Sequence, residues 1–317
     1  MSHMREGEEK SLSLVTIPTT QPGTRKRRIK AVFFDFMGTC LDWHSGVSSA
    51  LPAGIAEATR SRLALDWREE FFGELHARSL LGLPPEDIDI THRKTLLRIL
   101  GWDVYEGERR HFVGLDDNNN TTDSNNTGSG NGASASPDVA ALAPGPGPGP
   151  PDAGTGAVER AVRAWHNIAP WSDVRPALTA LKSEHEPEHE PGLELFVLAN
   201  GTTRLQLDLV RSSGLEGIFS LLFSSELLGV YKPAPEAYEK ALGLVRVRPD
   251  EAVMVAAHAY DLRAARALGM STVYVHRWTD DRSEDMDAVR RENDAFLEDG
   301  MEGLHSVVKA LSSDLTV

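Results

Sequence analysis

Cysteine is almost absent from this sequence, since Cys40 is the only one among 317 residues. A single cysteine excludes an internal disulfide and is typical of proteins from reducing compartments. Apolar runs that approach the roughly 20 residues of a membrane helix are also missing. These absences predict a cytoplasmic protein that has no membrane partner.

Positive charge is scarce, because 33 Lys and Arg stand against 47 Asp and Glu, a formal net charge of -14. Nucleic-acid binding needs a basic face, so we expect no nucleic-acid partner. A locally positive pocket can still bind a small anion on an acidic protein. The expected partner is a small-molecule substrate, and a homodimer is left open because no residue specifies an interface.

Two stretches lack the apolar residues that a core requires. Residues 1–27 are polar with scattered Pro and Gly, and residues 114–156 form a low-complexity run rich in Asn, Ser, Gly and Pro. Such compositions bury too little apolar surface to offset the entropy lost on ordering. We predict a disordered N-terminal flank and a disordered insertion.

Apolar runs with a strand-like length alternate with helical patterns in the second half of the chain. Continuous apolar strands separated by helices are typical of a parallel sheet that is covered on both faces. A first apolar run lies apart from the others, beyond a block with helical periodicity at 47–111. The expected strands are 29–36, 193–199, 219–224, 252–257 and 272–276.

This pattern predicts an α/β fold with a Rossmann-like parallel-sheet core and an inserted helical cap domain. The core would comprise residues 28–45 and 171–317, and the cap residues 46–170. The acidic segment 284–311 is expected to be a terminal helical segment with charged faces.

Polar residues follow the predicted strands at their carboxyl ends. Asp35 follows the first strand, Asn200 the second, Lys232 the third, and His258 with Asp261 the fourth. Ligands bind at this edge of open parallel α/β sheets. We therefore expect these five side chains to converge on one site.

The four strand ends carry motifs that resemble those of the haloacid dehalogenase superfamily. They are Asp35-Phe36-Met37-Gly38-Thr39, Ala199-Asn200-Gly201-Thr202, Tyr231-Lys232-Pro233 and the segment Ala256–Asp261. Within the superfamily the chain is most similar to the hydrolytic L-type 2-haloacid dehalogenases, which Trp67-Arg68 and Ala169-Pro170-Trp171-Ser172 also resemble.

The resemblance implies a nucleophilic aspartate and a covalent ester. Asp35 would attack the halogen-bearing carbon, because a desolvated carboxylate beside a cation becomes a competent nucleophile. Lys232 would keep Asp35 ionised and Thr39 would hydrogen-bond it. Water activated near Asp261 would then hydrolyse the ester and release a 2-hydroxy acid.

Met37 favours a dehalogenase over a phosphatase of the same superfamily, which usually carries an aspartate there to protonate the leaving alkoxide. Methionine cannot donate a proton, whereas a halide leaving group needs none. No metal ligand or cofactor is required on this scheme, with magnesium kept open. The expected catalytic residues are Asp35, Lys232, Asp261 and Thr39, and the expected substrate- and halide-binding residues are Arg68, Asn200, Met37, Tyr238, His258 and Tyr260.

Alternatives remain open for several positions. Arg68 has acidic neighbours and could form a surface ion pair, and His258 could be a structural histidine or a base. Ala199, Ala256 and Ala257 stand where the resembling dehalogenases have serine or other small hydroxyl residues. The competing hypotheses are a magnesium-dependent phosphatase and a non-catalytic binding protein.

Overall fold

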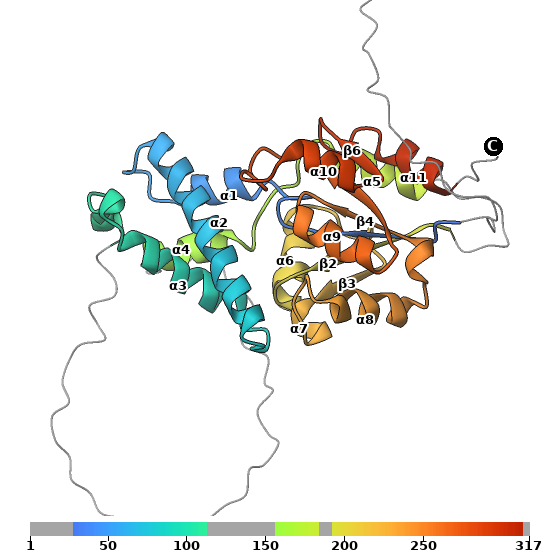
Figure 1. The fold of residues 1–317 in the computed structure, drawn as a ribbon. Helices are drawn as coiled ribbons and strands as arrows, with labels where there is room; N and C mark the ends of the chain where they lie inside the picture. The colour runs from blue at the N-terminus through green and yellow to red at the C-terminus, as the bar shows by residue number, and fades with distance from the viewer. Residues whose placement is uncertain (1–27, 113–155, 184–191, 313–317) are drawn as a thin grey trace, which may run out of the picture.

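The computed structural model describes residues 28–112, 156–183 and 192–312 (Figure 1). The predicted flank lies outside the described residues, and so does the predicted insertion apart from Gly156. None of the helices within these ranges is both long and apolar enough to cross a membrane.

Six parallel strands form one sheet in the order β3-β2-β1-β4-β5-β6, with β1 paired to β2 on one side and to β4 on the other. This order confirms the predicted Rossmann-like α/β core. The strands are β1 (Ala31–Phe34), β2 (Glu194–Ala199), β3 (Leu221–Ser224), β4 (Ala252–Ala256), β5 (Ser271–Val275) and β6 (Ala295–Leu297).

Helices cover both faces of the sheet because the strands are apolar on both sides. Along β1, Val32 and Phe34 enter one apolar cluster, whereas Ala31 and Phe33 enter the other. The first cluster includes α5 (Val174–Ser183), α6 (Thr203–Ser212) and α11 (Leu304–Ser312). The second includes α7 (Ser225–Leu228), α8 (Pro235–Val245), α9 (Ala259–Ala267) and α10 (Met286–Glu292), and Figure 1 shows the resulting layers.

A second group of helices lies beside the carboxyl edge of the sheet (Figure 1). It consists of α1 (Trp43–Ala50), α2 (Glu57–Leu80), α3 (Ile88–Leu100), α4 (Ala157–Ala164) and the 3-10 turns η1 (Asp103–Tyr105) and η2 (Arg109–His111). Trp165 packs at its centre, stacked on Trp43 at 5.8 Å and edge-on to Trp67 at 5.3 Å between ring centroids. The proposed start of the cap at residue 46 falls inside α1.

The segments that enter and leave this group of helices, residues 40–42 and 169–171, lie side by side. Asp42 N donates to Ala169 O at 2.9 Å, and Trp171 N donates to Cys40 O at 3.1 Å. A bridge between Leu41 and Pro170 joins the two passages. The helical group is therefore anchored directly beside the end of β1.

The prediction of a helical segment at 284–311 is wrong for its middle part, where residues 295–297 form a strand. The chain forms α10, then β6, and only then α11. β6 extends the sheet beyond β5, with Val273 opposite Ala295 and Val275 opposite Leu297. Strand pairing at the edge of the sheet outweighs the local helical tendency of this charged segment.

Candidate active site

The turn after β1 is held by side chains from three distant parts of the chain. The carbonyl of Met37 accepts from Arg68 Nη2 at 3.2 Å, that of Gly38 from Trp171 Nε1 at 2.8 Å, and that of Thr39 from Arg277 Nε at 3.2 Å. Two hydrogen bonds to Asp173, at 3.0 and 2.8 Å, fix Arg277 in turn. The carbonyl groups that would otherwise be buried without partners are thereby satisfied.

Gly38 is required in this turn. Its φ of 90° lies in the region that only glycine adopts without strain, and a Cβ there would lie 2.7 Å from both carboxylate oxygens of Asp280. We expect Gly38→Ala to lower the free energy of unfolding by about 2–5 kcal/mol, from backbone strain and overpacking together. Urea unfolding measures this change.

Gly73→Ala is the matched control for this substitution. Gly73 lies within α2, and a Cβ there would have nothing within 4 Å. Alanine favours a helix interior by up to about 1 kcal/mol, so the control should unfold at an equal or higher urea concentration. Equal midpoints for Gly38→Ala and wild type would contradict the account of the turn.

Asp35 lies at the end of β1 and is buried, with 6% of its surface exposed. Its Oδ1 accepts from Lys232 Nζ at 2.9 Å and its Oδ2 from Thr39 Oγ1 at 2.7 Å. Burial alone would raise the pKa of this carboxyl, but Lys232, His258 and Thr39 outweigh it and lower the pKa. Asp35 is consequently a carboxylate that is both desolvated and ionised.

Lys232 lies between two buried carboxylates, because its Nζ contacts Asp35 and also hydrogen-bonds Asp261. Burial opposes its charge, but the two carboxylates raise the pKa of the ammonium group. The side-chain amide of Asn200 fixes the Lys232 backbone from both ends, with Nδ2 donating to Lys232 O at 3.0 Å and Oδ1 accepting from Lys232 N at 2.8 Å.

Asp261 lies on the other side of the Lys232 ammonium group from Asp35 and is fully buried. It has no exposed surface, its Oδ2 contacts Lys232, and its Oδ1 accepts from Tyr238 OH at 2.5 Å. Burial raises the pKa of Asp261, and only part of this effect is offset by Lys232. Tyr238, which was predicted to bind substrate, is fully buried and donates to Asp261.

Arg68 is buried in an aromatic surround, contrary to the surface ion-pair alternative. Its guanidinium carbon lies 4.4 Å from the ring centroid of Phe72 and 5.3 Å from that of Trp43. Its Nη2 is 3.9 Å from Asp280 Oδ1. The aromatic faces and this carboxylate together stabilise a guanidinium that has left water.

Two adjacent aspartates follow β5, of which Asp280 is buried and Asp281 is partly buried. Asp280 Oδ2 accepts from Trp43 Nε1 at 3.1 Å and from Thr279 Oγ1 at 2.6 Å, while its Oδ1 is buried without a hydrogen bond. Asp281 accepts from the backbone N–H of Ala259 at 2.5 Å. Neither residue was predicted from the sequence, since neither belongs to a motif at a strand end. Their one local signal is an adjacent acidic pair in a turn after a strand.

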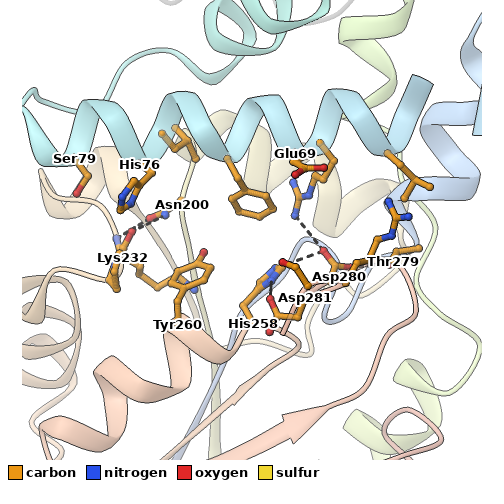
Figure 2. Close-up of a pocket in the computed structure, with 17 residues that line it drawn as sticks. Glu69, His76, Ser79, Asn200, Lys232, His258, Tyr260, Thr279, Asp280 and Asp281 are labelled. Atoms are coloured by element: carbon orange, nitrogen blue, oxygen red, sulfur yellow. Dashed lines mark hydrogen bonds and ion pairs between the residues drawn. The ribbon is translucent and has the colours of Figure 1, made fainter. Parts of the chain in front are cut away.

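A cavity of about 550 Å³ lies between α2 and the carboxyl edge of the sheet. Figure 2 shows Glu69, His76 and Ser79 on α2 facing Asn200, Lys232, Tyr260 and His258 from the core. Apolar side chains, including Leu65, Phe72 and Leu75, line the α2 side.

The cavity includes only some of the residues predicted to bind substrate or halide. Arg68, Asn200, His258 and Tyr260 line it, as does Lys232, whereas Tyr238 does not and the Met37 side chain packs against the core. Asn200 has one remaining amide N–H after its hydrogen bond to Lys232. The structure thus brings anion-binding groups and the Asp35–Lys232 pair to the same edge.

Magnesium needs several oxygen ligands at once. Both oxygens of Asp261 are already engaged by Lys232 and Tyr238, and Lys232 also holds Asp35. In the described ranges, no three His, Cys, Asp or Glu side chains are grouped as a metal site. The arrangement around Asp35 therefore does not fit a bound magnesium ion.

Comparisons with known proteins identify the family of the chain. A family model of haloacid dehalogenase-like hydrolases matches residues 29–269. Haloacetate dehalogenase H-2 of Moraxella sp. (strain B) is 30% identical over 127 residues, 40% of this chain and 54% of that protein. Glyceraldehyde 3-phosphate phosphatase of Methanopyrus kandleri is 31% identical over 165 residues, 50% of this chain and 66% of that protein.

A solved structure extends the likeness to most of the chain. The crystal structure of an L-2-haloacid dehalogenase matches with a TM-score of 0.63 and 26% identity, covering 89% of this chain and 99% of that one. By sequence, the chain spans about half the length of the curated dehalogenases it matches first. The resemblance inferred from the four motifs is confirmed.

Proposed function

The chain belongs to the haloacid dehalogenase-like hydrolases, and we propose that it cleaves the carbon–halogen bond of a small 2-haloacid through an ester on Asp35. The Asp35 carboxylate attacks C2 of the acid, and the halide leaves with the bonding electron pair. Water then attacks the carbonyl of the ester and releases a 2-hydroxy acid. Asp35 is regenerated as a carboxylate.

One observation supports this proposal above the others: Asp35 is ionised, desolvated and held by Thr39 and by Lys232, which lines the cavity. A carboxylate fixed in this way has lost the hydration that makes it a weak nucleophile in water. Arg68 and the free amide N–H of Asn200 lie along the same cavity and can stabilise a departing anion.

The phosphatase alternative has support from a phosphatase relative but not from position 37. An alkoxide leaving group needs a proton, and Met37 offers only its carbonyl, which accepts from Arg68. A halide is a weak base and leaves without a proton. The residues at the site therefore favour halide release over phosphate-ester hydrolysis.

Halide release from wild-type protein is the direct test. We expect release from 2-chloro or 2-bromo acids at an unchanged rate in excess EDTA, and no release of phosphate from phosphate esters. Ion chromatography of the halide and a colorimetric phosphate assay measure the two outcomes.

The same experiment separates the competing functions. Phosphate release that requires magnesium would replace the dehalogenase proposal with the phosphatase. Release of neither product from a broad panel of acids and phosphate esters would favour a binding role for this fold.

A further inference from the structure

The buried state of Asp261 leaves the hydrolytic water without a base in the proposed reaction. Asp261 has no exposed surface, and Lys232 and Tyr238 occupy its two oxygens. Asp35, by contrast, keeps 6% of its surface exposed. With no exposed surface and both oxygens engaged, Asp261 has no oxygen open to a water molecule in the arrangement seen.

His258, unlike Asp261, is accessible from the cavity. It lines the cavity beside the nucleophile, with Nε2 at 3.7 Å from Asp35 Oδ2 and 3.4 Å from Met37 O. Its other ring nitrogen, Nδ1, is 3.6 Å from Asp281 Oδ1. Figure 2 shows His258 and Asp281 next to each other below α2.

Aromatic rings hold the imidazole in this orientation. Tyr260 stacks on His258 with ring centroids 5.6 Å apart, and Phe72 of α2 meets it edge-on at 5.3 Å. Asp281 is itself fixed by the backbone N–H of Ala259 and by Tyr274 OH at 3.3 Å. An imidazole oriented by a fixed carboxylate is the usual construction of a general base.

We infer that His258 Nε2 is the general base that deprotonates the water attacking the Asp35 ester, with Asp281 as the residue that positions it. This assignment rests on the proposed function, because it requires the ester on Asp35. It moves His258 out of the group of substrate-binding residues.

The charges around His258 link its protonation to the state of Asp35. Facing it are Asp35 after β1, and Asp280 and Asp281 from the loop after β5. Arg68 of α2 approaches the same Asp280 Oδ1 and the same Met37 carbonyl as His258 Nε2. Burial alone would lower the pKa of this imidazole, but the close contact with Asp281 and the charges of Asp35, Asp280 and Asp281 raise it to about 9. Ester formation removes the Asp35 charge, so the pKa of His258 falls at that stage.

The proton balance closes over one turnover. In the resting protein His258 is an imidazolium beside the Asp35 carboxylate. Once the ester has formed and halide has left, His258 loses its Nε2 proton to solvent, while Nδ1–H stays directed at Asp281. Neutral Nε2 then takes a proton from water as the water oxygen bonds to the ester carbonyl carbon. Breakage of the bond between that carbon and the ester oxygen, with transfer of the water's remaining proton to that oxygen, yields the hydroxy acid, with imidazolium and carboxylate restored.

Substitution of His258 should separate the two chemical steps. We expect His258→Ala to lower steady-state halide release by about 10²–10³-fold, in the range of a lost general base, and to keep a burst of one halide per protein. The intact mass should show the accumulated ester. Imidazole in the buffer should restore turnover, and Asp281→Asn should lower turnover while also retaining the burst.

His111→Asn is the matched control, since His111 lies in η2 and does not line the cavity. Its turnover should equal that of wild type. In the His258→Ala protein, burst and turnover could instead fall together, with no ester and no effect of imidazole. That outcome would overturn the assignment of His258 as the base but leave the proposed function standing. Wild-type protein that releases no halide would overturn the proposed function, and the assignment with it.

Discussion

Asp35→Asn is expected to lower halide release by on the order of 10⁴-fold or more, because the amide cannot attack carbon to form the ester. The burst of halide and the ester mass should both disappear, in contrast to the result expected for His258→Ala. Single-turnover halide measurement and intact mass spectrometry on the same samples report both. Asp35→Ala should give the same result. It serves as a second variant because alanine, unlike asparagine, cannot be converted to aspartate by hydrolysis of a side-chain amide.

The Asp35→Asn protein should remain folded. Lys232 keeps its contact with Asp261, so no buried charge is left without a partner. We expect the free energy of unfolding to change by less than about 3 kcal/mol, the upper end for one hydrogen bond to a charged group. Asp103→Asn, in the exposed turn η1, controls for the chemical change. Halide release above about a hundredth of the wild-type rate would place the nucleophile elsewhere, given the loss expected for a missing nucleophile.

Lys232→Met is expected to lower both activity and stability. It leaves the buried carboxylates of Asp35 and Asp261 without the ammonium group that lies between them. Removal of one partner from a buried ionic group costs about 3–5 kcal/mol of unfolding free energy. Urea unfolding near neutral pH measures the loss, and a halide assay on the folded fraction should show activity close to that of Asp35→Asn.

The destabilisation caused by Lys232→Met should depend on pH in a direction that can be predicted. In wild type the pKa of Asp35 is lowered from 3.8, so its contribution to stability is present above that value and is lost as pH falls through the folded pKa. Without Lys232, burial raises the pKa of both carboxyls, and the folded state binds more protons than the unfolded state. The variant should therefore be less destabilised at about pH 5 than at about pH 7.

Lys94→Met is the matched control for Lys232→Met. Lys94 forms ion pairs with Glu74 and Glu86 across the helical group, and 46% of its side chain is exposed. Exposed pairs contribute about 0–1 kcal/mol, so this variant should unfold close to wild type at both pH values. An equally small loss for Lys232→Met would contradict the central role of its charge.

The sequence predicted most of the sheet because each core strand is a continuous apolar run. β6 was missed because a three-residue strand in a charged segment has no periodicity of its own and depends on pairing with β5. The aromatic surround of Arg68 could not be predicted either, since Trp43 and Phe72 approach it from separate helices.

At the site, the motifs placed Asp35, Lys232, Asn200, His258 and Asp261 at one edge, but they did not give the partner of each polar atom. Asn200 uses both ends of its amide on the Lys232 backbone, and Asp261 is sealed by Tyr238. These details depend on side-chain directions in three dimensions. Asp280 and Asp281 were missed for another reason, because they lie in a loop that has no recognisable sequence pattern.

The central place of β1 in the sheet has a consequence for biosynthesis. β1 is synthesised before both of its neighbours, which begin 163 residues later for β2 (194 − 31) and 221 residues later for β4 (252 − 31). At synthesis rates of about 5–20 residues per second, the apolar segment waits roughly 10–40 seconds for a strand to pair with. The helices of the 43–183 region have mostly nearer partners and can pack during this interval. Completion of the sheet, and with it the assembly of Asp35, Lys232 and Asp261, is then a late event on the ribosome.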